Sequence, residues 1–356
     1  MQVHNKNSLK LAIVKSSVYQ DLWVCEKTKD ILKVFKSTMM RTPPIGLSEF
    51  FDTEFIIVKD VDAYPCNINK CCLSSNHFND MKYSKKNKNP SLPFLDETFH
   101  QDISIDSVAY NPYDVDWSNY NIIIAINMCI PESVIEKYSN ILWCYLIGEN
   151  EDKYTYNKIS KYDLVLNQDV TKQNLPFHNI GFPYSFLGPY TIENISEKIP
   201  NLLLASKKKG IYLEINNTTE RPVNTIPEQF KIISNRLDIP IILHSQNILE
   251  NIKRIINAKY FVKLYGRVIR GNGILEVIST GTLILINKRL IMYDDLIPNE
   301  CHVENAVELA NKIYYFENNP DAYDAIILKQ KTLLYTNYYK APADNLIRKY
   351  YEKINN

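Results

Sequence analysis

Hydrophobic residues along this chain form short runs that alternate with segments of helical spacing. Continuous apolar runs, which are typical of strands buried in a parallel sheet, lie at residues 121–128, 141–149 and 162–168. The sequence "PESVIEKYS" between the first two runs predicts a short helix. Alternating strands and helices predict βαβ units around a parallel sheet, whereas the N-terminal third has a less regular pattern.

A connector rich in proline and glycine, residues 181–200, interrupts the alternation, which then starts again. Four further strands are predicted, at residues 210–216, 239–245, 260–266 and 282–287. Helices are predicted between them, at residues 227–237, 247–256 and 273–280. Their apolar residues recur at helical spacing, as Phe230, Ile233 and Leu237 do. The chain therefore contains two α/β halves.

Three more helices are predicted after the last strand. The first covers residues 303–314, with apolar positions in register at Val303, Ala306, Val307, Ala310 and Tyr314. The last carries an apolar and aromatic face made of Ile347, Tyr350, Tyr351 and Ile354. Because such a face needs a partner surface, we expect this helix to pack against another part of the protein.

A chain of 356 residues is longer than one ordinary hydrophobic core requires. We therefore expect two domains, residues 1–188 and residues 189–335. The remaining residues, 336–356, are expected to form a helix that crosses back to the first domain.

The composition narrows the class of protein. Hydrophobic residues make up 45% of the chain and charged residues 23%, as in ordinary globular proteins. The net charge of +1 gives no strong basic field, so we expect neither nucleic acid nor a membrane surface as partner. The N-terminus lacks the pattern of a secretory leader, and apolar runs such as residues 122–126 are too short for a transmembrane segment.

The seven cysteines show no regular disulfide pattern, so we expect reduced thiols and a cytoplasmic location. One cluster, Cys66, Cys71, Cys72 and His77, has the spacing C-x4-C-C-x4-H. Zinc sites usually contain two close ligand pairs, which this spacing does not provide. No metal site is therefore expected there.

Four of the nine glycines lie within residues 266–283, "GRVIRGNGILEVISTGTL". A P-loop is excluded because Asn272 and Gly273 stand where a lysine and a hydroxyl residue are required. A dinucleotide-binding turn is excluded because Glu276 replaces its third glycine.

A short helix accounts for the same residues. Asn272 is a suitable N-cap, and Gly281 is suited to the position just after the helix end. The amides of Gly271 and Gly273 then predict an anion site at the helix N-terminus.

Three charged residues fit a nucleotide diphosphate at this helix. Arg267 and Arg270 would add positive charge for the phosphates. Glu276, about one turn into the helix, would accept hydrogen bonds from a sugar diol. Ordinary alternatives stay open, because Glu276 could complement the helix dipole and the arginines could be surface charges.

The segment "RGNGILEVISTGTLILIN" resembles the nucleotide-sugar signature of GT-B type glycosyltransferases, roughly G-x-x-E-A-x-x-x-G-x-x-x-I. The resemblance implies an α/β protein with two Rossmann-like domains facing across a cleft, and C-terminal helices that pack back on the first domain. It also implies that Glu276 binds the donor ribose. Val268 stands where many retaining members carry a second glutamate, so the choice between retaining and inverting transfer stays open.

Further candidates for donor binding follow from this fold, because they lie after strands of the second half. Thr218, Thr219 and Arg221 would reach the phosphates from one loop, and Lys263 would approach them from another. His244 would stack on the base or bond its edge. The alternatives are a polar surface turn for the first group and a structural histidine for His244.

Inverting transfer needs a base that takes a proton from the acceptor hydroxyl. The first domain offers Glu149 at the end of a strand, and Asp102 and His100 in the segment "DETFHQDISID". The alternative for each is an ordinary polar loop residue.

These observations predict a cytoplasmic glycosyltransferase that moves a sugar from a nucleotide-diphosphate sugar to a carbohydrate or glycoconjugate acceptor. The D-x-D triplets, at Asp60–Asp62 and Asp114–Asp116, do not stand at convincing strand ends, so no metal or other cofactor is expected. The alternatives are a nucleotide-sugar epimerase on the same architecture and a non-catalytic protein that binds nucleotides or sugars.

Overall fold

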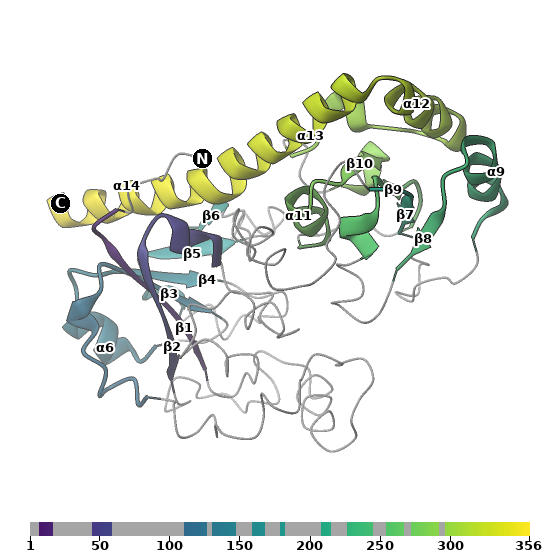
Figure 1. Cartoon of the computed structure of the whole chain (residues 1–356). Helices are drawn as coiled ribbons and strands as arrows, with labels where there is room; N and C mark the ends of the chain where they lie inside the picture. The colour runs from purple at the N-terminus through teal and green to yellow at the C-terminus, as the bar shows by residue number, and fades with distance from the viewer. Residues whose placement is uncertain are drawn as a thin grey trace, which may run out of the picture. The chain divides into compact units, whose positions relative to one another are not determined.

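The computed structural model describes residues 7–16, 45–58, 110–126, 130–146, 159–167, 179–181, 208–214, 226–244, 254–266, 272–291 and 296–356. The chain divides into two compact units. Met1–Gly188 and Tyr339–Asn356 form the first unit, and Pro189–Tyr338 forms the second. Figure 1 shows the elements of both units.

The first unit contains a six-stranded sheet in the order β2-β1-β3-β4-β5-β6. Its strands are β1 (Lys10–Ser16), β2 (Asp52–Val58), β3 (Ile122–Ile126), β4 (Leu142–Leu146), β5 (Leu164–Asn167) and β6 (Asn179–Gly181). All of their pairings are parallel. The predicted strands at residues 121–128, 141–149 and 162–168 are confirmed as β3, β4 and β5. The hydrophobic pattern did not predict β1, which lies inside the sheet.

Both faces of this sheet are buried, which explains the continuous apolar runs. One face packs Trp143 and Tyr145 with Val134 and Ile135 of helix α6 (Glu132–Lys137). Trp117, in the 3-10 helix Trp117–Asn119, packs edge-on against Trp143 with ring centroids 5.7 Å apart.

The opposite face of the first sheet packs against the C-terminal helix α14 (Ala341–Asn355). Leu346 and Ala343 are fully buried against strand residues such as Leu11 and Ile124. Ile347 and Tyr350 pack at the border of this cluster, as predicted. Tyr351 and Ile354, however, are each 44% exposed, so the predicted packing face is wrong at these two positions.

The second unit contains a four-stranded parallel sheet in the order β10-β9-β7-β8. Its strands are β7 (Ile211–Leu213), β8 (Ile241–Leu243), β9 (Tyr260–Lys263) and β10 (Leu283–Ile286). Helices α9 (Glu228–Leu237) and α11 (Asn272–Ser279) lie between strands of this sheet along the chain. The structure thus confirms the α/β class and a second run of parallel strands.

Two helices close the second unit, α12 (Ala306–Asn318) and α13 (Pro320–Leu334). The predicted apolar stripe of α12 is wrong at Val307 and Tyr314, which are 71% and 62% exposed, whereas Val303, just before the helix, is buried as predicted. The buried residues are instead Leu309, Ile313 and Phe316. Asn305 caps the helix by accepting bonds from the amides of Val307 and Glu308, which sets this register. A π-helical segment, Tyr335–Lys340, then leads into α14.

Short 3-10 helices complete the described elements, at Ile45–Glu49, Lys288–Leu290 and Asn299–Cys301. Within the described residues, no helix is both long enough and apolar enough to cross a membrane. Cys144 and Cys301 are buried free thiols.

Candidate functional site

The order of strands in the second sheet identifies an edge suited to ligand binding. The chain adds β8 on one side of β7 and then β9 and β10 on the other side. The direction of winding therefore reverses between β7 and β9. In open parallel sheets, ligands bind beyond the carboxyl ends of the strands at this switch point.

Two charged residues lie side by side at this switch point. The register pairs Leu213 of β7 with Val262 of β9, and the amide of Glu214 donates to the carbonyl of Val262 over 3.1 Å. The next residues, Glu214 and Lys263, therefore project from the same face of the sheet. Nζ of Lys263 lies 3.1 Å from Oε1 of Glu214. The side chain of Lys263 is 0% exposed and that of Glu214 is 17% exposed.

Aromatic side chains lie on the same face as this ion pair, because side chains alternate along each strand. Tyr212 of β7 stacks on Phe261 of β9, with ring centroids 5.4 Å apart and planes 13° apart. The hydroxyl of Tyr212 and Nδ1 of His244 form a 2.7 Å hydrogen bond. His244 directly follows β8, so its link to Tyr212 joins the ends of β8 and β7.

Helix α11 begins at Asn272, one residue before the predicted start at Gly273, so Asn272 is the first residue of the helix and not its N-cap as predicted. The helix buries Ile274, Val277 and Ile278 as predicted. The chain leaves β9 at its carboxyl end and must return to the amino end of β10. The N-terminus of α11 therefore lies at the carboxyl edge of the sheet.

Gly281 ends α11, as the sequence predicted. Its φ of +68° is in the left-handed region, and its amide donates to the carbonyl of Ile278 over 2.9 Å. The amide of Thr282 donates to the carbonyl of Val277 over 3.1 Å. This pair of bonds is a Schellman motif, in which glycine is favoured at the left-handed position.

Few of the predicted site residues lie in the part that the structure describes. Glu276, Asn272 and Gly273 belong to α11, but only their backbone is described. Nine further predicted donor and catalytic residues lie outside the described residues: Gly271, Arg270, Arg267, Arg221, Thr219, Thr218, Glu149, Asp102 and His100. The cluster of Cys66, Cys71, Cys72 and His77 also lies outside them.

Lys263 and His244 are the predicted donor residues whose side chains are described. Both lie at the carboxyl edge of the sheet, where Lys263 contacts Glu214 and His244 contacts Tyr212. Glu214, the partner of Lys263, is a site residue that the sequence analysis missed. The strands predicted at residues 210–216 and 260–266 extend past both residues, whereas β7 ends just before Glu214 and β9 ends at Lys263.

Metal ligands do not gather in the described part of the chain. No group of three His, Cys, Asp or Glu side chains in those ranges is arranged to hold an ion. The expectation of metal-independent chemistry stays a prediction.

No family model and no curated protein matches the sequence. Solved structures that match the whole chain include enzymes of glycosyl transfer. One is a glycosyltransferase from Rickettsia africae, with 14% identity over 98% of this chain and 100% of that chain, at a TM-score of 0.42. Another is an alpha-glucosyltransferase in complex with UDP-glucose and DNA, with 11% identity, coverage of 98% and 100%, and a TM-score of 0.44.

A third match is the β-glucosyltransferase of T4 phage, with 10% identity, coverage of 97% and 99%, and a TM-score of 0.41. The same enzyme also matches as a complex with UDP and Mn²⁺. Similarity at this level assigns neither substrate nor mechanism to this chain.

Proposed function

We propose that this protein is a glycosyltransferase that takes a sugar from a nucleotide-diphosphate sugar. The proposal rests on one observation. The N-terminus of α11 and the buried cation Lys263 lie at the same edge of the second sheet. Ligands bind at such an edge in open α/β sheets, and helix N-termini favour anions. Glu276 lies on α11, so it belongs to the element that would meet the ribose.

The proposed reaction divides the work between the two units. The second unit would hold the donor, with α11 and Lys263 stabilising the charge that develops on the leaving diphosphate. Arg267, Arg270, Arg221 and Thr219 are proposed to add contacts to the phosphates. The first unit would hold the acceptor and provide the base, for which Glu149, Asp102 and His100 are the candidates. A GT-B arrangement, with the two units facing across a cleft, is part of this proposal.

Nucleotide binding is the first experiment. Nucleoside diphosphates and nucleotide sugars are screened for a rise in melting temperature, because a ligand that binds only the folded state raises its stability. Glu276→Ala should abolish the shift, while Glu308→Ala, near the start of helix α12, should keep it. Unchanged nucleotide affinity in a folded Glu276→Ala protein would refute the donor site.

Turnover then separates the candidate functions. A glycosyltransferase releases the nucleoside diphosphate only when an acceptor is present. An epimerase would convert the nucleotide sugar without an acceptor, and a binding protein would leave it unchanged. Activity should persist in chelator, whereas a loss restored by Mn²⁺ or Mg²⁺ would contradict metal independence.

A further inference from the structure

Lys263 is a charged residue in an unusual position. Its side chain is 0% exposed, and a buried ammonium is costly unless an anion compensates its charge. In the described part of the chain, Glu214 is the anion that contacts it. The ion pair therefore places a positively charged side chain, that of Lys263, at the switch point of the sheet.

A second ion pair, near the other end of β9, provides a comparison. Lys259, just before β9, lies 2.9 Å from Glu317, and both side chains are partly exposed. Glu317 also accepts a 2.7 Å hydrogen bond from the hydroxyl of Tyr260. This pair lies at the amino end of β9, opposite to the edge where ligands bind in such sheets. Both pairs consist of a lysine and a glutamate and lie near an end of β9, but they differ in which end and in burial.

We propose that Glu214 is a resident anion that competes with the donor's diphosphate for Lys263. This inference rests on the proposed function. It assigns to Glu214 the control of nucleotide affinity: the carboxylate neutralises Lys263 in the empty site, and phosphate oxygens take its place when the nucleotide binds.

The chemistry of the two groups supports such an exchange. Carboxylate and phosphate oxygens are the same kind of acceptor for the three donors of an ammonium. Glu214 is more exposed than Lys263, so a ligand approaching from solvent meets the carboxylate before it reaches the ammonium. The carboxylate therefore weakens binding, and it also favours release of the leaving diphosphate after transfer.

The binding of pyrophosphate, UDP and GDP is measured by calorimetry, so that the test does not depend on which nucleobase the protein prefers. Glu214→Gln, which keeps the size of the side chain, should bind these ligands about tenfold more tightly. Lys263→Met should bind them at least about tenfold more weakly. The double variant should behave like Lys263→Met, because Glu214 acts through Lys263. Glu317→Gln, the matched control, removes the helix α12 partner of Lys259 near the amino end of β9, and it should bind like the wild type.

Two results would overturn the inference. If the wild type binds a nucleoside diphosphate but Glu214→Gln leaves its affinity unchanged or weaker, the competition is wrong and the proposed function stands. If the wild type binds no nucleoside diphosphate and no nucleotide sugar, both fail. Should Lys263→Met not fold, Glu214→Gln alone decides, because the predicted gain in affinity cannot come from loss of structure.

Discussion

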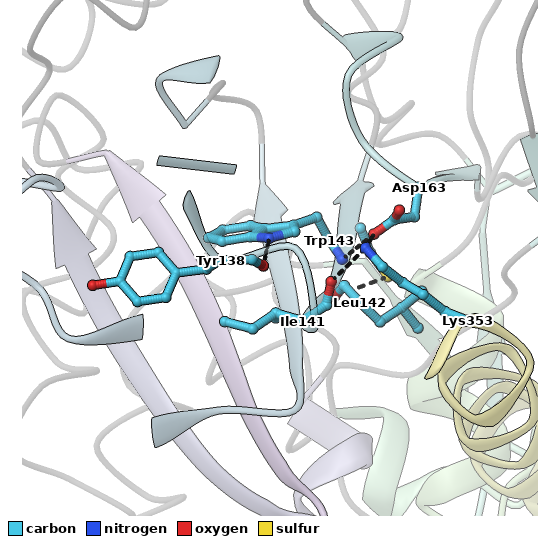
Figure 2. Close-up of polar contacts among 7 residues, drawn as sticks. Tyr138, Ile141, Leu142, Trp143, Asp163 and Lys353 are labelled. Atoms are coloured by element: carbon cyan, nitrogen blue, oxygen red, sulfur yellow. Dashed lines mark hydrogen bonds and ion pairs between the residues drawn. The ribbon is translucent and has the colours of Figure 1, made fainter. Parts of the chain in front are cut away.

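Nζ of Lys353, in the C-terminal helix α14, lies 2.6 Å from Oδ2 of Asp163, the residue before β5 (Figure 2). The same carboxylate oxygen accepts a 2.8 Å bond from the amide of Trp143. Lys353 also donates to the carbonyl of Ile141 over 2.8 Å. One side chain thus connects the helix to the amino ends of β4 and β5.

Replacing Lys353 by Met should loosen α14. The variant loses a charge-assisted bond to a partly buried carboxylate and a bond to a carbonyl, a loss of about 1–2 kcal/mol. Hydrogen exchange of the α14 amides measures this local stability. Lys349→Met, which removes an exposed pair with Glu352 on the same helix, should change it by less than about 0.5 kcal/mol. Equal effects of both variants would contradict the anchoring role of Lys353.

The packing face of α14 gives a second prediction. Leu346 is fully buried against the first sheet, so Leu346→Ala should destabilise the docked helix by about 2–4 kcal/mol. Tyr351→Ala should have a smaller effect, because Tyr351 is 44% exposed whereas Leu346 is fully buried. Denaturant unfolding followed by the tryptophans of the first unit measures both. A larger loss of stability from Tyr351→Ala than from Leu346→Ala would instead support the packing face predicted from the sequence, which includes Tyr351.

Strands were predicted best, because the apolar runs of β3, β4 and β5 have few alternatives when both faces of a sheet are buried. The buried faces of the helices were predicted less well. Helix α12 offers two apolar stripes, one with Val307 and Tyr314 and one with Ile313 and Phe316. Tyrosine tolerates exposure as well as burial, so the sequence could not choose between these stripes. The structure buries the second.

The ion pair of Glu214 and Lys263 could not be predicted from the order of residues along the chain. The two residues belong to strands that are separated by β8 in sequence. They become neighbours because β9 pairs with β7 rather than with β8. Strand order is a property of the whole sheet, whereas the end of α11 at Gly281 depends on local backbone geometry and was predicted correctly.

Gly281→Ala should destabilise the second unit by about 1 kcal/mol, because an L-residue is strained at a φ of +68°. The added methyl carbon would also lie 3.3 Å from Cε and Nζ of Lys331. Gly281→Asn should cost less than a bulky branched residue, since asparagine tolerates the left-handed region. Thermal unfolding of the wild type and of Gly281→Ala, Gly281→Asn and Gly281→Val measures this order. Equal stability of Gly281→Ala and the wild type would exclude the strain.

Lys208 should make the stability of the second unit depend on pH. Its Nζ donates to the carbonyl of Thr280 over 2.8 Å and to the hydroxyl of Thr282 over 2.9 Å, at the turn between α11 and β10. Burial, with a smaller contribution from the ammonium of Lys331, lowers the pKa of Lys208 to about 7. The folded state thus favours the neutral amine.

The sign of the effect follows from proton linkage. In the unfolded chain Lys208 keeps its ordinary pKa of 10.5, so between pH 7 and that value the unfolded state binds the extra proton. The free energy of unfolding should therefore rise with pH in this window, by up to about 1.4 kcal/mol per pH unit. Below pH 7 both states are protonated, and this contribution stays at its minimum.

Lys208→Met isolates this contribution. Denaturant unfolding is measured for both proteins at several values between pH 6 and pH 9, and the difference between them is plotted against pH. The wild type should gain stability relative to Lys208→Met as the pH rises. Lys331→Met should shift the onset of this gain to higher pH, because the repelling ammonium is removed. A difference that stays flat from pH 6 to pH 9 would show that Lys208 keeps the same protonation state when the protein unfolds.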